Sequence, residues 1–242
     1  MKQFGRFPKL TACVVALAGA LIASSVQAAV GTARVRAIRG DAQYAEGSNW
    51  LPLRVGQTLR PGTVLRTANA SQVDLFMDKN GPLVRLTENT TLSIDKLDFD
   101  DTGVDTVIET QLDLRSGRIL GVVRRMAATS KYEVKTPNGV AGIRGTTYDI
   151  SATTRAAIGE GSLVVVYVKP DGTVITQVVG DGQVFEPSLE GVIDLTPEQR
   201  AELDAVIREM QGGEPPAPDQ QIVIYVSPTV GEQNLSMMYS MP

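Results

Sequence analysis

Short runs in which apolar and polar residues alternate recur through most of the chain, and they restrict its fold more than any other feature. Val35 and Ala37 alternate with arginines, and the pattern returns at residues 73–77, 112–114 and 132–134. Side chains on a β-strand point alternately to its two faces, so this period of two indicates half-buried strands. Turn dipeptides lie between the runs at Asn80-Gly81, Asn138-Gly139, Asp171-Gly172 and Asp181-Gly182. We therefore predict an all-β domain over residues 29–187, built as a multi-stranded β-sandwich or a β-solenoid.

Three details qualify this pattern. Phe76 interrupts the polar face of the run at residues 73–77. Residues 163–168 are apolar throughout, which predicts a central strand covered on both faces. Residues 64–69 resemble residues 133–138, and residues 55–57 resemble 181–184, which suggests two similar β layers or solenoid turns.

Residues 188–213 are expected to form a helical extension of the β domain. A helix is predicted over residues 197–210. Thr196 and Gln199 can form a capping box at its start, and proline, here Pro197, is favoured in the first turn. The apolar residues of this helix share one face, and they are Leu203, Val206, Ile207 and Met210. This face is predicted to dock on the β domain, with a partner protein as the alternative.

The last segment, residues 214–242, is expected to contain a linker, a strand and a tail. Residues 214–221 are rich in proline and predict a stiff linker. Residues 222–226 have strong β propensity and are expected to form a terminal strand that could return to an edge of the main sheet.

Residues 1–28 have the parts of a secretory signal peptide: a basic start, an apolar run at residues 10–23, and small residues at Val26 and Ala28. We expect cleavage after Ala28, with an uncleaved anchor as the alternative. Cys13 precedes most of the apolar run, so we do not interpret it as a lipidation site. The mature chain is then expected to be periplasmic or secreted, without cysteine and without a membrane span.

Composition excludes several classes of function. The chain has no histidine, which rules out Ser-His-Asp and Cys-His catalysis and imidazole-bound metals. Of 23 basic residues, Lys2, Arg6 and Lys9 would leave with the signal peptide, and 27 acidic residues remain, so the mature charge is about −7. Such a chain is a poor candidate for binding nucleic acid.

The clearest local motif is glycine-rich and covers residues 135–148. It lacks the Gly-Lys-Ser/Thr of a phosphate-binding loop, and strand rather than helix is expected after it, which argues against a dinucleotide fingerprint. We interpret Gly142 and Gly145 as structural positions where backbone approaches backbone.

These residues resemble the FecR domain of bacterial envelope signalling proteins over about residues 31–168. Thr136-Pro137-Asn138-Gly139 and Arg144-Gly145-Thr146 are similar to the most recognisable stretch of that domain, and residues 50–67 and 114–118 are similar to its upstream half. The motif positions are Trp50, Gly56, Gly62, Thr67, Gly117, Thr136, Pro137, Gly139, Arg144, Gly145 and Thr146.

The resemblance implies an all-β periplasmic module that binds an envelope protein partner. The best-known members also carry a cytoplasmic anti-sigma segment and a membrane span, and only nine residues precede the apolar run here, so control of a sigma factor is not carried over.

Two further groups of charged residues are candidate sites. Asp98, Asp100, Thr102 and Glu109 have the spacing of a calcium loop, but strand-like flanks favour a solvated acidic loop. A local basic patch is predicted from Arg115, Arg118, Arg124 and Arg125. Its main interpretation is a solvated strand face, and an anion site is the minor one.

The favoured function is a non-catalytic binding or sensing module without a cofactor, acting through protein contacts in signalling. The alternative is a structural or adhesive envelope protein that uses the same β domain.

Overall fold

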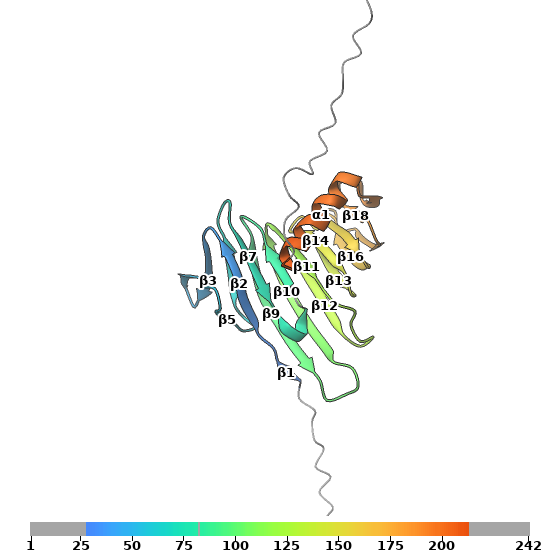
Figure 1. The fold of residues 1–242 in the computed structure, drawn as a ribbon. Helices are drawn as coiled ribbons and strands as arrows, with labels where there is room; N and C mark the ends of the chain where they lie inside the picture. Colours follow the sequence, from blue (N-terminus) through green and yellow to red (C-terminus); the bar gives the residue numbers. More distant parts are fainter. Residues whose placement is uncertain (1–27, 82, 213–242) are drawn as a thin grey trace, which may run out of the picture.

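The protein is described by a computed structural model that covers residues 28–81 and 83–212. Two β-sheets stack face to face, and helix α1 lies across the outer face of one of them (Figure 1). The predicted all-β class and the C-terminal helix are confirmed. The expected signal peptide (residues 1–27 of it), the linker, the terminal strand and the tail lie outside the described residues.

Sheet A contains ten strands within the described residues, in the order β17-β16-β13-β12-β10-β9-β6-β3-β4 with β1 beside β9. Their bounds are Ala29–Val30 (β1), Ala42–Glu46 (β3), Asn49–Pro52 (β4), Val64–Thr67 (β6), Thr91–Asp100 (β9), Val107–Ser116 (β10), Lys131–Thr136 (β12), Gly139–Ile143 (β13), Leu163–Val168 (β16) and Val174–Val179 (β17). β10 and β12 run parallel, whereas β9–β10 and β12–β13 are antiparallel.

Sheet B contains nine strands in the same part of the chain, in the order β19-β18-β15-β14-β11-β8-β7-β2-β5. Their bounds are Ala33–Arg39 (β2), Thr58–Leu59 (β5), Gln72–Phe76 (β7), Leu83–Leu86 (β8), Arg118–Val122 (β11), Thr147–Ser151 (β14), Ala156–Glu160 (β15), Gln183–Glu186 (β18) and Gly191–Asp194 (β19). Two short 3₁₀ turns, Asp78–Asn80 (η1) and Pro187–Leu189 (η2), interrupt the strands.

The chain adds strands to the two sheets in turn. β7 and β8 belong to sheet B, β9 and β10 to sheet A, β11 to sheet B, and β12 and β13 to sheet A. The two similar segments of the sequence, residues 64–69 and 133–138, contain β6 and β12 of the same sheet. Both similar segments therefore supply interior strands of one sheet in a two-layer sandwich, although β6 is antiparallel to β9 whereas β12 is parallel to β10.

The core lies between the inner faces of the two sheets. Leu92, Leu112 and Val134 from sheet A and Leu86 and Ile150 from sheet B are all fully buried in one cluster. The polar residues that alternate with them, such as those of β12, are partly exposed on the outer face. Burial of one face per strand is the dominant favourable term, at about 25 cal/mol per Å² of apolar surface.

Helix α1 (Pro197–Met210) begins and ends where the sequence predicts. Thr196 accepts a hydrogen bond from the Gln199 backbone, and the Gln199 side chain accepts one from the Thr196 backbone, which completes the capping box. Leu203, Ile207 and Met210 are buried, and they pack on Leu83 and Leu120 of sheet B. The prediction that this face docks on the β domain is thus confirmed.

Ion pairs of sheet B flank this helix. Arg85 donates two hydrogen bonds to the Asp74 carboxylate at 2.6 and 2.8 Å, and it reaches Glu209 of α1 at 3.2 Å. Burial of Arg85 disfavours its charge, but the hydrogen bonds and charges of Asp74 and Glu209 outweigh burial and raise the pKa of Arg85. Arg118 forms a similar two-bond pair with Asp149.

Two expectations need correction. β16 is not a central strand covered on both faces, because β17 alone separates it from the edge of sheet A and the side chains of Val164 and Val168 are 41% and 42% exposed. Continuous apolarity was a misleading signal here, since β-branched residues also suit an exposed strand. The β structure also continues beyond residue 187, because β19 pairs with β18.

Among the described residues, α1 is too short and too polar to cross a bilayer, and the structure offers no other helical span.

Candidate binding site

The second half of the glycine-rich motif holds one loop in place. Gly145 has a positive φ of 72°, and a Cβ there would lie 2.9 Å from the Arg125 Cα. Thr146 and Val123 exchange two backbone hydrogen bonds of 2.9 Å, and Arg144 donates to the Ala128 carbonyl at 2.8 Å. The motif therefore fixes the segment of residues 123–130 from both ends.

The first half of the motif joins strands inside the sandwich. The buried hydroxyls of Thr136 and Thr154 lie 2.7 Å apart and share a hydrogen bond. A Cβ on Gly139 would lie 2.3 Å from the Val166 carbonyl oxygen, so this position requires glycine. Pro137 is exposed at the turn between β12 and β13.

The upstream motif positions are also architectural. Thr67 is buried and donates to the Thr87 carbonyl at 2.6 Å, while the Thr90 backbone donates to the Thr67 hydroxyl at 3.0 Å. Gly117 has a φ of 80° and packs against Thr90, where a Cβ would meet backbone at 2.5 Å.

Gly56 and Gly62, with φ values of 84° and 90°, form turns with open space around them. Trp50 lies half-buried on β4 near the edge of sheet A, and the Arg66 guanidinium stacks 4.0 Å from the centre of its ring. The stacking stabilises the rim of the domain.

One motif position departs from the expectation. Gly142 has room for a side chain, because a Cβ there would meet only the Val164 carbonyl oxygen, at 3.9 Å. It lies in the middle of β13 opposite Val164. The interpretation of Gly142 as a close backbone approach is therefore wrong, whereas the contact geometry agrees with that interpretation for Gly145.

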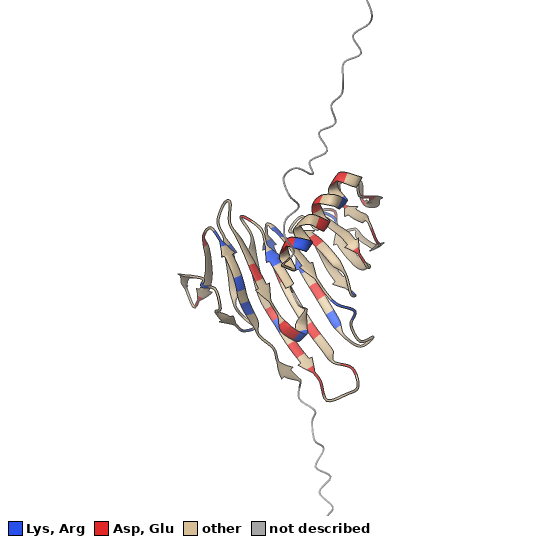
Figure 2. Ribbon diagram, viewed as in Figure 1, with Lys and Arg blue, Asp and Glu red and all other residues tan. Residues whose placement is uncertain are grey.

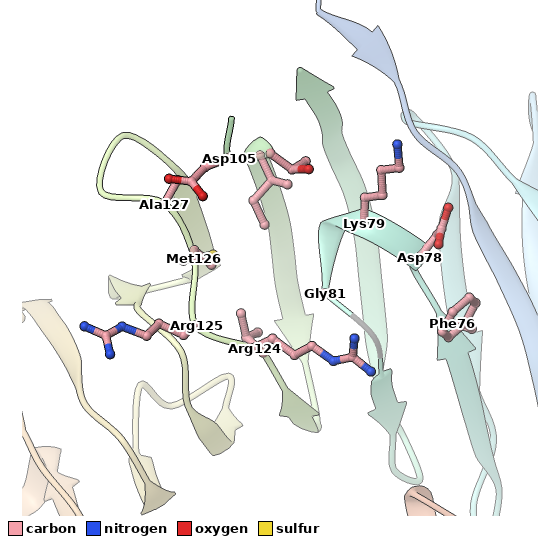
Figure 3. Close-up of a pocket in the computed structure, with 12 residues that line it drawn as sticks. Phe76, Asp78, Lys79, Gly81, Asp105, Arg124, Arg125, Met126 and Ala127 are labelled. Atoms are coloured by element: carbon pink, nitrogen blue, oxygen red, sulfur yellow. The ribbon is translucent and has the colours of Figure 1, made fainter. Parts of the chain in front are cut away.

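An open cleft of about 330 Å³ lies beside the segment of residues 123–130 (Figure 3). Its opposite wall consists of Phe76, η1 and Gly81, and the start of β10 closes a third side. The full lining comprises Phe76, Asp78, Lys79, Gly81, Asp105, Thr106, Ile108, Val123, Arg124, Arg125, Met126 and Ala127. Apolar side chains and charges of both signs thus meet in one open concavity.

The cations of the cleft differ in their partners. Lys79 pairs with Asp101 and stacks 4.7 Å from the centre of the Phe99 ring. Arg124 and Arg125 are exposed, and neither forms an ion pair with any described residue. Figure 3 shows Arg124 reaching toward the η1 wall while Arg125 extends in the opposite direction. Arg124 is therefore the cation best placed to meet an anionic group in the cleft.

A tyrosine pair lies behind this wall. The Tyr132 and Tyr148 hydroxyls are 3.1 Å apart and fully buried, and the Tyr132 ring lies against Gly81. Burial raises the pKa of both phenols well above their usual value. The two buried hydroxyls bond to each other, which fits a structural role in the core.

The four clustered arginines of the sequence do not form one patch. Arg115 pairs with Asp113 on β10 of sheet A, whereas Arg118 pairs with Asp149 on sheet B. Arg124 and Arg125 alone line the cleft. The predicted basic patch is wrong as a unit, because residues close in sequence lie on different sheets.

The candidate calcium residues lie along the β9–β10 hairpin. Asp98 is directly opposite Glu109, and the Lys96 ammonium lies between them at 3.4 and 2.7 Å. Thr102 donates to Asp100 from both its hydroxyl and its backbone, which lowers the pKa of that carboxyl. Residues 28–81 and 83–212 contain no group of three or more His, Cys, Asp or Glu side chains placed to hold a metal ion.

Sequence reasoning singled out Arg124 and Arg125 but not the cleft around them. Phe76 was the available signal, because it is an aromatic residue on the polar face of its strand. No sequence pattern marked Lys79 and Met126 as neighbours, because a turn and a loop that are far apart in the sequence bring them together in the fold.

Comparison with known proteins gives one match. Residues 63–167 match the family model described as FecR protein. No curated protein matches the chain, and no solved structure does. The matched region contains the Thr136 to Thr146 motif and three walls of the cleft.

Proposed function

This chain is a FecR-domain protein, and we propose that it is a non-catalytic binding or sensing module of the bacterial envelope, exported to the periplasm or beyond. It acts through protein–protein contacts in signalling. The FecR family is a regulatory family of the envelope, which supports this class of function. The absence of histidine and of a nucleophile–base pair in the motif fits a module that binds without chemistry.

The observation that carries the proposal is the position of the cleft next to the family motif. Arg144, Gly145 and Thr146 hold the segment of residues 123–130, and that segment forms the cleft wall that presents Arg124. The motif thus supports a surface feature as well as the core. Pre-organised walls lower the entropy cost of binding a partner.

The chemistry of the cleft favours an acidic segment of an envelope protein. Phe76, Ile108 and Met126 offer apolar contact, and Arg124 offers a bidentate donor for a carboxylate. Asp78 and Asp105 at the rim disfavour a strongly anionic ligand such as a polyphosphate. A peptide with one carboxylate beside an apolar side chain suits both properties.

The test compares capture of envelope proteins by the whole chain and two charge-reversed variants. Arg124→Glu removes the cleft cation, and Arg115→Glu changes an exposed arginine on β10 that is paired with Asp113. We expect Arg124→Glu to weaken capture of a specific partner by about tenfold or more, because it places two like charges together. Arg115→Glu should capture the same partner as the unchanged protein.

Equal capture by all three proteins would rule out the cleft as the binding site. Recovery of the protein only in insoluble, wall-associated material would instead favour a structural or adhesive role.

A further inference from the structure

The outer face of β16 and β17 carries a stripe of valines, here called the valine face: Val164, Val166, Val168, Val174 and Val178. Val166 is partly buried and the other four are exposed. Val164 lies directly opposite Val178, and Val168 opposite Val174. Val174 and Val178 are 60% and 66% exposed. Thr176 lies between them on β17, opposite Val166.

The valine face contrasts with β9, β10 and β12 in the middle of sheet A. Charged residues recur on β9, β10 and β12 (Figure 2). Neither β16 nor β17 contains a charged residue or a proline. Exposed β-edges are normally protected by lysine, proline or a bulge, because an open edge is a template for pairing. β17 ends sheet A in the described residues and has none of these protections.

One side of the edge strand is packed on the core. Ile175 and Val179 face inward, where Val179 is fully buried in the core and Ile175 packs against it. At the tip of the β16–β17 hairpin, Lys169 pairs with Glu190 at 2.8 Å, which ties the hairpin to the turn before β19. A fixed strand with an open edge loses little entropy when another strand pairs with it.

We propose that β17 pairs antiparallel with β17 of a second copy of this chain, about a two-fold axis at Thr176. Residues directly opposite in an antiparallel pair point to the same face of the sheet. A two-fold axis at Thr176 places Val174 opposite the partner's Val178, and Thr176 opposite the partner's Thr176. The two valine faces then form one continuous apolar surface.

This register pairs residues 174–178, five of the six residues of β17, with Thr176 at their centre. It also satisfies the rule that a two-fold interface contacts itself. Threonine pairs and β-branched pairs are favourable across antiparallel strands.

The side-chain pattern of β17 supports a second copy as the occupant, because its outward residues Val174, Thr176 and Val178 read the same in both directions about Thr176. The net charge of −4 makes two copies repel each other over most of their surfaces. β16 and β17 contain no charged residue, so pairing at this edge adds no close pair of like charges to that repulsion.

The test measures the mass of the whole chain by light scattering and sedimentation over a concentration series. We expect a dimer, and a halved apparent mass for Val174→Lys combined with Val178→Lys, because lysines protect an edge. Val55→Lys is the matched control, since Val55 is a valine 62% exposed in a distant turn, and it should remain dimeric. A monomeric unchanged protein, or a dimer that survives both lysines, would overturn the proposal.

Cysteine cross-linking tests the register without depending on the lysine variant. In a Cys13→Ser background, Thr176→Cys should form a disulfide dimer under mild oxidation, because the two positions are opposite each other across the axis. Val174→Cys alone should not, whereas Val174→Cys with Val178→Cys should. A dimer cross-linked equally by every variant would refute the Thr176 axis. Arg124→Glu should leave all of these results unchanged, which separates dimerisation from binding at the cleft.

Discussion

The outer faces of the two sheets differ in how they are covered. Sheet B lies under α1, and its buried polar residues are paired, as Arg85 and Asp74 are. Sheet A has no helix over it in the described residues, and its outer face divides into a charged part on β9, β10 and β12 and the valine face on β16 and β17.

The difference separates stability from association. Apolar and charged groups under α1 are removed from water, so changes there act on the free energy of unfolding. Valines on the outer face of sheet A remain in water in one copy of the chain, so changes there act on contacts with other molecules. Three substitutions test this division, and a fourth, at Gly145, tests the loop beside the cleft. They follow from the largest expected effect to the smallest.

Asp74→Ala should lower the free energy of unfolding by about 3–5 kcal/mol, because it leaves Arg85 buried without its main partner. Urea titration followed by circular dichroism measures this. Asp113→Ala is the control on sheet A: it breaks an exposed pair with Arg115 and should cost less than about 1 kcal/mol. Equal losses for the two variants would contradict the contrast between the faces.

Leu203→Ala should lower the free energy of unfolding by about 2–4 kcal/mol, since Leu203 is buried between α1 and sheet B. Leu189→Ala removes a leucine that is 61% exposed and should have almost no effect. Chemical denaturation of both proteins decides this. A negligible loss for Leu203→Ala would mean that α1 adds little to the stability of the sandwich.

Gly145→Val should cost about 1–3 kcal/mol, because a β-branched residue is strained at positive φ and meets the backbone of Arg125. Gly142→Val is the matched control, because that glycine lies on the outer side of β13 beside Val164 with room for a side chain. The melting temperature should fall for Gly145→Val alone. An unchanged melting temperature at Gly145 would reopen residues 138–146 as a ligand loop, with Arg144 as its contact.

Val178→Thr should change the free energy of unfolding by less than about 0.5 kcal/mol when measured at low protein concentration, because the side chain is 66% exposed. Denaturant titrations that agree with those of the unchanged chain would confirm it. A loss comparable to that of Leu203→Ala would show that the valine face contributes to the folded monomer.

Local patterns in the sequence were sufficient for part of this structure. The alternation of apolar and polar residues predicted where strands form, because alternation is a property of each strand alone. Thr196, Pro197 and Gln199 predicted the start of α1, since a cap depends on residues three positions apart. The stripe with Leu203 and Ile207 predicted a docked face, and it packs on sheet B.

Where the sequence failed, the missing information was which sheet each strand joins. Arg115 and Arg118 are three residues apart, yet the chain crosses from sheet A to sheet B between them. An apolar run such as residues 163–168 can form a covered strand or an exposed one. Only the tertiary structure shows that the outer side of β16 is left uncovered, so that Val164 faces solvent.

The sequence by itself determined the strands, the helix and the turns, because each depends on neighbours a few residues apart. Tertiary structure alone decided the cleft and the valine face. The cleft unites η1, the start of β10 and residues 123–130, and the valine face exists because no described element covers the outer side of β16 and β17. Both depend on the order of strands in space, which is set by the packing of the two sheets as a whole and is encoded in no single segment.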